Sequence, residues 1–123
     1  MEKNPSVQEI IALHLQSDEI IDLAAINGDY KTNNKEYKKR EKLFQIVSQD
    51  INLAKDVYSQ LLIKPCLATK ISAATECLKL NIFIDEAVVI LEEISEQTDI
   101  GTRRLDAEMV LRVWRGEFSG KKL

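Results

Sequence analysis

The sequence predicts an all-α protein of about six helices, arranged as three stacked helical hairpins in a short α-solenoid. Apolar residues recur at spacings of three and four along most of the 123-residue chain, which is the period of amphipathic helices. No stretch alternates apolar and polar residues with a period of two, so no strand is expected. Only 4 glycines and 2 prolines interrupt the chain. Turn signals recur roughly every twenty residues, which is typical of stacked hairpins.

The first half of the chain is expected to hold three helices. The first covers residues 6–26, with a kink at residues 16–18. It ends at the Asn-Gly-Asp sequence of residues 27–29, where the glycine suits a left-handed helix end and the aspartate suits the N-cap of the next helix. The second and third helices are expected over residues 30–48 and 51–62. The packing seam of the second helix is expected to consist of Tyr30, Tyr37, Phe44 and Val47.

The second half is expected to hold three further helices, the last of them over residues 103–114. Pro65 suits the first turn of a fourth helix that ends near residue 80, and Asn81 suits a left-handed cap after it. Asp85 is expected to N-cap the fifth helix, with Ile84 and Val89 forming a hydrophobic staple across its first turn.

Length and composition favour one soluble domain over residues 1–123. The chain is 45% hydrophobic and 30% charged, which is a globular profile that argues against disorder. No secretion signal opens the chain and no apolar stretch approaches a membrane span, so a bacterial cytoplasmic location and no membrane contact are expected. Cys66 and Cys77 lie too far apart along one helix to form a disulfide, and both are expected to be small buried side chains.

Charge is distributed in bands along the chain. The net charge is only −3, but residues 81–100 carry −6 and residues 31–42 carry +4. The fifth helix is expected to present an acidic face without cationic partners, since its segment contains no lysine or arginine. Candidate partner-binding residues are therefore Asp85, Glu86, Glu92, Glu93, Glu96 and Asp99.

Two further surfaces stand out in the sequence. A stripe of lysines on the second helix is suited to a phosphate backbone or to the acidic helix of another copy, although Tyr37 is expected to point into the seam and not to lie among the lysines. The last helix is more apolar than a terminal solenoid helix should be, so Trp114 is a further candidate partner contact, with core packing as the alternative. The stripe comprises Lys31, Lys35, Lys38, Lys39 and Lys42.

No set of residues suits catalysis, cofactor binding or metal binding. The single histidine, His14, lies within the apolar stripe of the first helix with no nucleophile or carboxylate placed beside it, so a structural role is expected. His14 and the two cysteines do not have the spacing of a metal site. No glycine-rich phosphate loop or nucleophile elbow is present. We therefore expect no enzymatic activity, no catalytic residue and no cofactor.

Several segments resemble a bacterial family of short HEAT-like, all-helical proteins known as a domain of unknown function. The similar segments include Leu61-Leu62 with Pro65, Ala87 with Leu91-Glu92-Glu93-Ile94, and Ala107-Glu108-Met109 with Trp114 and Gly116. Around Pro65 the chain has Lys-Pro-Cys-Leu where the family usually has His-Pro-Asn-Pro. Members of this family look like immunity proteins, the antitoxin partners of secreted bacterial toxins.

The resemblance implies a HEAT-like fold and a protein-binding function. The expected function is that of an immunity protein, which neutralises a cognate toxin domain by stoichiometric binding over its active site, and a basic toxin domain would suit the acidic segment. Two alternatives remain open at this point. One is a homo-oligomeric scaffold or adaptor, such as a homodimer, that acts without a toxin partner. The other, less expected, is nucleic-acid binding through the Lys31 to Lys42 stripe.

Overall fold

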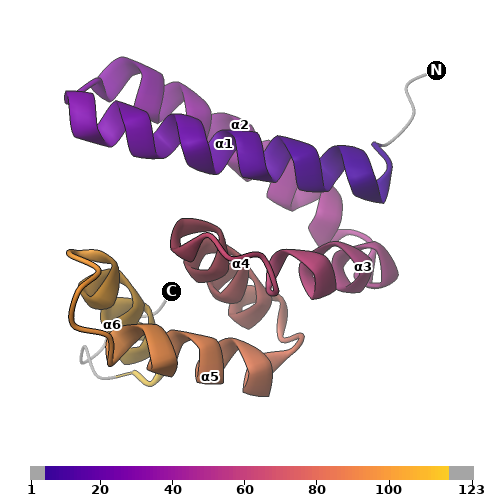
Figure 1. Ribbon diagram of the computed structural model, residues 1–123. Helices are drawn as coiled ribbons and strands as arrows, with labels where there is room; N and C mark the ends of the chain where they lie inside the picture. The colour runs from indigo at the N-terminus through magenta and orange to yellow at the C-terminus, as the bar shows by residue number, and fades with distance from the viewer. Residues whose placement is uncertain (1–4, 117–123) are drawn as a thin grey trace. The chain divides into compact units, whose positions relative to one another are not determined.

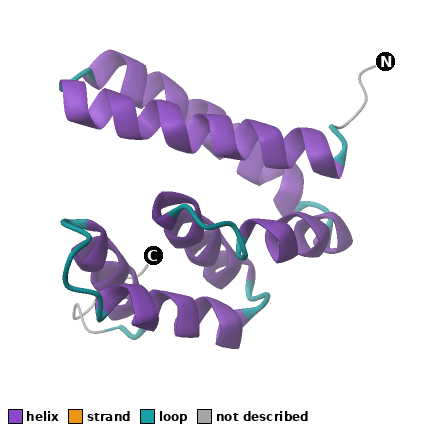
Figure 2. Cartoon of the chain, in the orientation of Figure 1, coloured by secondary structure: helices purple, strands orange, loops and turns teal. Residues whose placement is uncertain are grey.

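Six α-helices joined by short links make up residues 5–116, which are the residues described by the computed structural model of this protein (Figure 1). No strand occurs within that range (Figure 2), so the predicted all-α class is confirmed. The HEAT-like stacking of three hairpins stays a prediction. The helices are α1 (Val7–Asn27), α2 (Tyr30–Ser48), α3 (Ile51–Leu61), α4 (Leu67–Leu80), α5 (Ile84–Ser95) and α6 (Arg103–Trp114).

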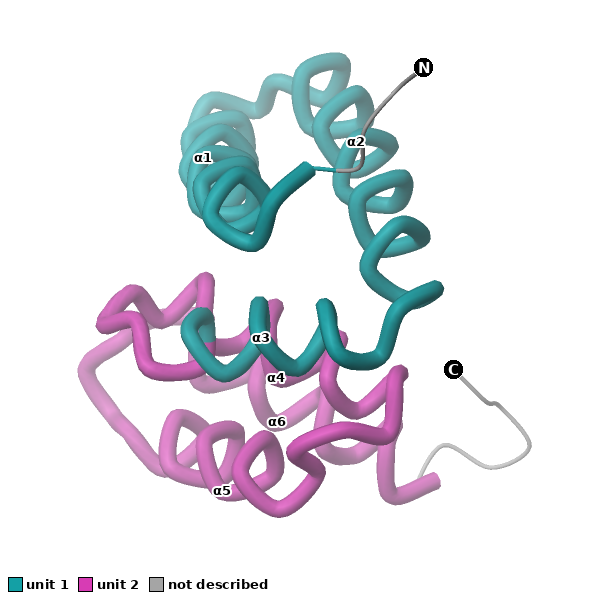
Figure 3. The backbone as a smooth tube through the Cα atoms, turned by 90° about the vertical axis from the view of Figure 1, so that its right-hand side faces the viewer, with its two compact units in different colours: residues 1–61 teal, residues 62–123 magenta. Residues whose placement is uncertain are grey.

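The chain divides into two compact units, Met1–Leu61 and Leu62–Leu123 (Figure 3). The first unit contains α1, α2 and α3, and the second contains α4, α5 and α6. The predicted helices all occur, and most of their ends lie within two residues of the expected positions.

Local capping signals define the start of α1 and the turn between α1 and α2. Ser6 and Glu9 form a reciprocal capping box at the start of α1. Gly28 ends α1 in the left-handed conformation, with φ 67°, which costs little in the absence of a Cβ. The carboxylate of Asp29 accepts hydrogen bonds from the backbone N–H and the hydroxyl of Thr32 at the start of α2. Helix α1 continues through residues 16–18, where the sequence suggested a kink.

The buried face of α2 differs from the predicted seam. Tyr30 and Tyr37 are 79% and 56% exposed, and the buried residues are Glu36, Arg40 and Val47. The prediction placed aromatic residues inside because of their hydrophobicity. The helix is instead rotated so that Arg40 faces inward, where its guanidinium binds two polar side chains of α1. The polar partners of Arg40 therefore determine which side of α2 is buried.

The third helix completes the first unit by packing against α1 and α2. Its buried residues are Ala54, Val57, Tyr58 and Leu61, at the i, i+3, i+4 and i+7 positions of one face. Figure 3 shows α3 running across the α1–α2 hairpin within this unit. The regular spacing explains why the sequence located this helix to within one residue.

The second unit packs α5 against both α4 and α6. Small buried side chains recur on all three helices, among them Ala73 and Ala74 on α4, Ala87 on α5 and Ala107 on α6. Their short side chains allow the helix backbones to approach closely, while Leu91 and its apolar neighbours fill the space between them. This packing leaves one side of α5 and one side of α6 toward solvent.

The beginnings of α4 and α5 correct two predictions. Pro65 lies before α4, not in its first turn, because Cys66 is extended and its carbonyl accepts the first helical hydrogen bond, from Lys70. Asp85 is not the N-cap of α5. The residue at the cap is Phe83, which adopts a left-handed conformation with φ 48°. Its carbonyl oxygen accepts a hydrogen bond from the backbone N–H of Ala87.

The predicted hydrophobic staple between Ile84 and Val89 is also wrong. Helix α5 begins at Ile84, one residue earlier than expected, and Val89 is 51% exposed. The expected left-handed cap at Asn81 is confirmed, with φ 58° and ψ 40°. Two left-handed residues, Asn81 and Phe83, therefore make the turn between α4 and α5.

Candidate functional site: the acidic face and the α5–α6 groove

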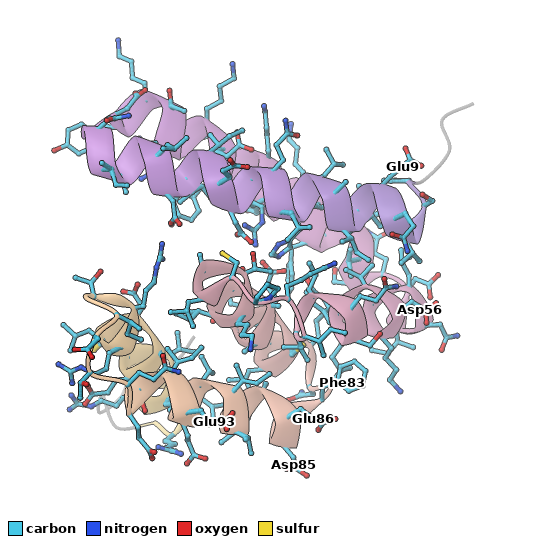
Figure 4. All side chains as sticks on the ribbon, viewed as in Figure 1. Glu9, Asp56, Phe83, Asp85, Glu86 and Glu93 are labelled. Carbon is cyan, nitrogen blue, oxygen red and sulfur yellow. The ribbon has the colours of Figure 1, made fainter. Side chains whose placement is uncertain are left out.

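One side of α5 is an exposed acidic surface. Ala87, Leu91 and Ile94 are the buried residues of this helix, and the carboxylates project from the other side. Asp85, Glu86 and Glu93 are directed outward from the α5 ribbon in Figure 4. We define the acidic face as the four exposed side chains that form no ion pair within residues 5–116. These are Asp85, Glu86, Glu93 and Glu96.

Glu92 does not belong to the acidic face, contrary to the sequence prediction of unpaired carboxylates. Its Oε2 accepts a hydrogen bond from Nη2 of Arg115, at the end of α6, over 2.8 Å. Both side chains are about half exposed, so this ion pair stabilises the packing of α5 on α6 by less than about 1 kcal/mol. Arg115 lies 23 positions from Glu92 in the chain, so the composition of the acidic segment gives no sign of this pairing.

A polar groove of about 420 Å³ lies between α5 and α6. Buried Leu111 contributes to its lining, and the other lining side chains are polar or charged. The groove offers both carboxylates and guanidinium groups, which suits ion pairs with charged side chains of a protein partner. Glu96 belongs both to this groove and to the acidic face, so the two surfaces are continuous. The lining residues are Glu92, Ser95, Glu96, Glu108, Leu111, Arg112 and Arg115.

Asp99 and Trp114, the remaining predicted site residues, lie elsewhere. Asp99 is exposed in the link between α5 and α6. Trp114 is partly buried and shares the packed side of α6 with Leu111. The apolar residues that α6 exposes are Leu105 and Met109, at 48% and 47%. In the sequence, Phe118 of the tail is a candidate to cover the apolar side of α6, and it lies outside the described residues.

The five lysines predicted to form a stripe on α2 are all exposed. Among them, only Lys39 forms an ion pair within the described residues, to Glu36 at 3.7 Å. The expectation that Tyr37 points into the seam is wrong, as its exposure shows. Tyr30 and Tyr37 therefore lie at the surface, on a different side of α2 from the lysine stripe.

A buried polar network links α1 and α2 within the first unit. Asp18 accepts a hydrogen bond from Arg40 over 2.7 Å, and Arg40 also contacts Nε2 of His14 over 2.7 Å. Nδ1 of His14 lies 3.2 Å from the second carboxylate oxygen of Asp18. A guanidinium only donates, so Nε2 accepts and the proton of the neutral imidazole sits on Nδ1. All three residues are at least nine-tenths buried.

The contacts of this network occupy both imidazole nitrogens of His14. The hydroxyl of Ser17, on the same helix, is buried and has no hydrogen-bond partner within the described residues. The expectation that no carboxylate lies beside His14 was wrong. Asp18 is four residues away on the same helix face, and that spacing was visible in the sequence. The contribution of Arg40 was not visible there.

The two cysteines are free and differ in environment. Cys77 is fully buried, and desolvation raises the pKa of its thiol to about 12. Cys66 is exposed, which corrects the prediction that both thiols are buried. Within residues 5–116, no group of three or more histidine, cysteine or acidic residues is arranged to hold a metal ion.

Comparison with known proteins gives no match to this chain, whether to a family model, to a curated protein or to a solved structure. Among the described helices, none is both long enough and apolar enough to cross a membrane.

Proposed function

We propose that this chain is a non-catalytic immunity protein that binds a basic toxin domain in the bacterial cytoplasm and covers its active site. The observation that carries the proposal is the acidic face of α5, whose four carboxylates have no cationic partner within residues 5–116. A basic protein surface is the partner that this charge distribution fits best.

The acidic face is unfavourable for the free protein. Glu96 lies three residues from Glu93 and four from Glu92, and like charges at these spacings destabilise a helix by a few tenths of a kcal/mol per pair. A basic partner relieves this repulsion and is attracted over distances of about a Debye length. The acidic face therefore favours rapid, salt-sensitive association with a cationic surface.

The groove adds specificity to this electrostatic attraction. Its continuity with the acidic face through Glu96 allows one partner to contact both surfaces. The partner's lysine or arginine side chains would pair with Glu96 and Glu108, which both line the groove. Toxin domains that act on nucleic acid carry cationic substrate surfaces, and covering such a surface would inhibit them stoichiometrically. The contact does not depend on Trp114.

The proposal is tested by recovering the tagged full-length protein from its native cells and comparing two triple variants. Glu86→Gln/Glu93→Gln/Glu96→Gln neutralises most of the acidic face. Glu19→Gln/Glu41→Gln/Asp56→Asn removes the same charge from exposed positions outside α5. We expect wild type and the second variant to recover a partner at one-to-one stoichiometry, with affinity at least about tenfold weaker for the first variant.

The toxin part of the proposal requires a second measurement. The recovered partner should arrest growth when expressed alone, and co-expression of the wild-type protein should restore growth. A partner that is harmless alone would contradict the immunity function and favour an adaptor. A partner whose binding is indifferent to both salt and the α5 variant would contradict the role of the acidic face.

One structural observation favours a second candidate function, nucleic-acid binding. Tyr30 and Tyr37 are exposed on the same helix as the lysine stripe, and exposed aromatic rings supply surfaces on which single-stranded bases stack. This function predicts that affinity for a single-stranded oligonucleotide falls steeply with salt and is lost on replacing Lys31, Lys35, Lys38 and Lys42 with glutamine. Equal affinity for a double-stranded and a single-stranded probe would contradict a role of the tyrosines in base stacking.

A further inference from the structure

Four lysines of α2 form a straight, unpaired basic row. They follow one another at the i, i+4, i+7 and i+11 positions, which confines them to about 60° of the helix circumference. They lie on the side opposite buried Arg40 and Val47. The row extends about 16 Å along the helix, from its first residue to its last. We call this set the lysine row: Lys31, Lys35, Lys38 and Lys42, all exposed and without an ion pair within residues 5–116.

The same chain carries a matching surface of opposite charge. The acidic face of α5 runs from Asp85 to Glu96, which is also eleven residues and about 16 Å. Val89, at 51% exposure, lies between its carboxylates and provides an apolar contact. Two exposed helix faces of equal length and opposite charge therefore belong to one chain.

We infer that the lysine row of one copy docks on the acidic face of α5 of a second copy. Each surface supplies the charge that the other lacks, and their equal length allows the charges to pair along the whole contact. The net charge of −3 leaves only weak repulsion between copies. The phosphates of a nucleic acid would extend well beyond the ends of the row, where the net negative charge of the chain would repel them. A second copy therefore fits the row better.

The contact joins two different surfaces, which gives it a distinctive consequence. An interface between unlike surfaces can be rebuilt from two variants, each of which retains one of the two surfaces. Self-association also uses the same α5 surface as the proposed basic partner. A second copy and that partner therefore compete, although the inferred self-association does not depend on the proposed function.

The inference is tested by sedimentation velocity of the full-length protein in about 10 mM and 1 M NaCl, where the Debye length is about 30 and 3 Å. We expect association in low salt that weakens by at least about tenfold in high salt. Lys35→Gln/Lys38→Gln/Lys42→Gln should sediment as a monomer, and so should Glu86→Gln/Glu93→Gln/Glu96→Gln. An equimolar mixture of the two variants should form a one-to-one dimer and nothing larger.

Matched controls separate this contact from general charge effects. Lys55→Gln/Lys64→Gln/Lys79→Gln removes three lysines outside the lysine row and should associate like wild type. The inference is overturned by a monomeric wild type in low salt, by variants that still associate, or by a mixture that stays monomeric. Association that is lost only on Leu105→Ser/Met109→Ser would overturn it in favour of the exposed side of α6.

The same variants distinguish this inference from the proposed function. The lysine-row variant should lose self-association and retain binding of the basic partner, because the acidic face of α5 is unchanged. Loss of partner binding in that variant would overturn the inferred division of roles between α2 and α5. Failure to recover any basic partner would affect only the proposed function.

Discussion

Replacing Arg40 with methionine should be among the most destabilising single changes in the first unit. Arg40 is 9% exposed and donates to Asp18 and His14 over 2.7 Å each. Methionine retains much of the apolar stem but removes the charge, so it leaves the carboxylate of Asp18, itself 6% exposed, without its cation. Breaking a buried ion pair from one side costs about 3–5 kcal/mol of the free energy of unfolding.

Urea denaturation followed by circular dichroism measures this loss. With an m value of about 2 kcal/mol per molar urea, the midpoint of unfolding should fall by about 2 M. The control is Lys39→Met, which also replaces a cationic side chain with methionine, at the neighbouring residue. Its side chain is 61% exposed and lies 3.7 Å from Glu36, so the expected cost is below about 1 kcal/mol.

A double variant tests the electrostatic origin of the effect. Asp18→Asn/Arg40→Met removes both charges and should be at least about 1 kcal/mol more stable than Arg40→Met alone, because no unpaired carboxylate remains. The reasoning is refuted if Arg40→Met costs less than about 1 kcal/mol. It is also refuted if the second substitution adds its full cost to the first.

Four further predictions concern single residues. The imidazole of His14, the only histidine, should show at pH 7 a protonated Nδ1 and an unprotonated Nε2 in long-range ¹H–¹⁵N spectra, and the opposite pattern would contradict the direction of its bond to Arg40. A thiol reagent at pH 8 should label Cys66 rapidly and Cys77 only on unfolding, so two equally fast thiols would contradict the burial of Cys77. Since the folded pKa of Cys77, about 12, lies above its unfolded value of about 8.5, the stability that it contributes is complete below about pH 8.5. That contribution should be lost as pH rises toward 12, and urea midpoints measured across this range would show it. Gly28→Ala should cost about 1 kcal/mol of unfolding free energy in the same urea assay, because a Cβ disfavours the left-handed φ of 67°, and an unchanged midpoint would contradict that reasoning.

Local signals in the sequence were sufficient for the helices and for several of their ends. The sequence analysis placed α2 and α6 at the bounds that the structure has, and Asp29 and Asn81 cap helices as their side chains and conformations predict. Each of these features depends on residues within about one helical turn of each other. The acidic side of α5 was visible for the same reason, since helical periodicity alone separates Glu93 from buried Leu91.

Tertiary contacts decided the features that the sequence analysis missed. Arg40 rotates α2 so that Tyr30 and Tyr37 are exposed, and its partners His14 and Asp18 lie on another helix. Arg115 forms an ion pair with Glu92, so this glutamate does not belong to the acidic face, although the two residues are 23 positions apart in the chain. Helical periodicity shows which side chains share a face. The groups that pack against a given face come from distant parts of the chain. The hydrogen bonds that these groups form determine which face is buried.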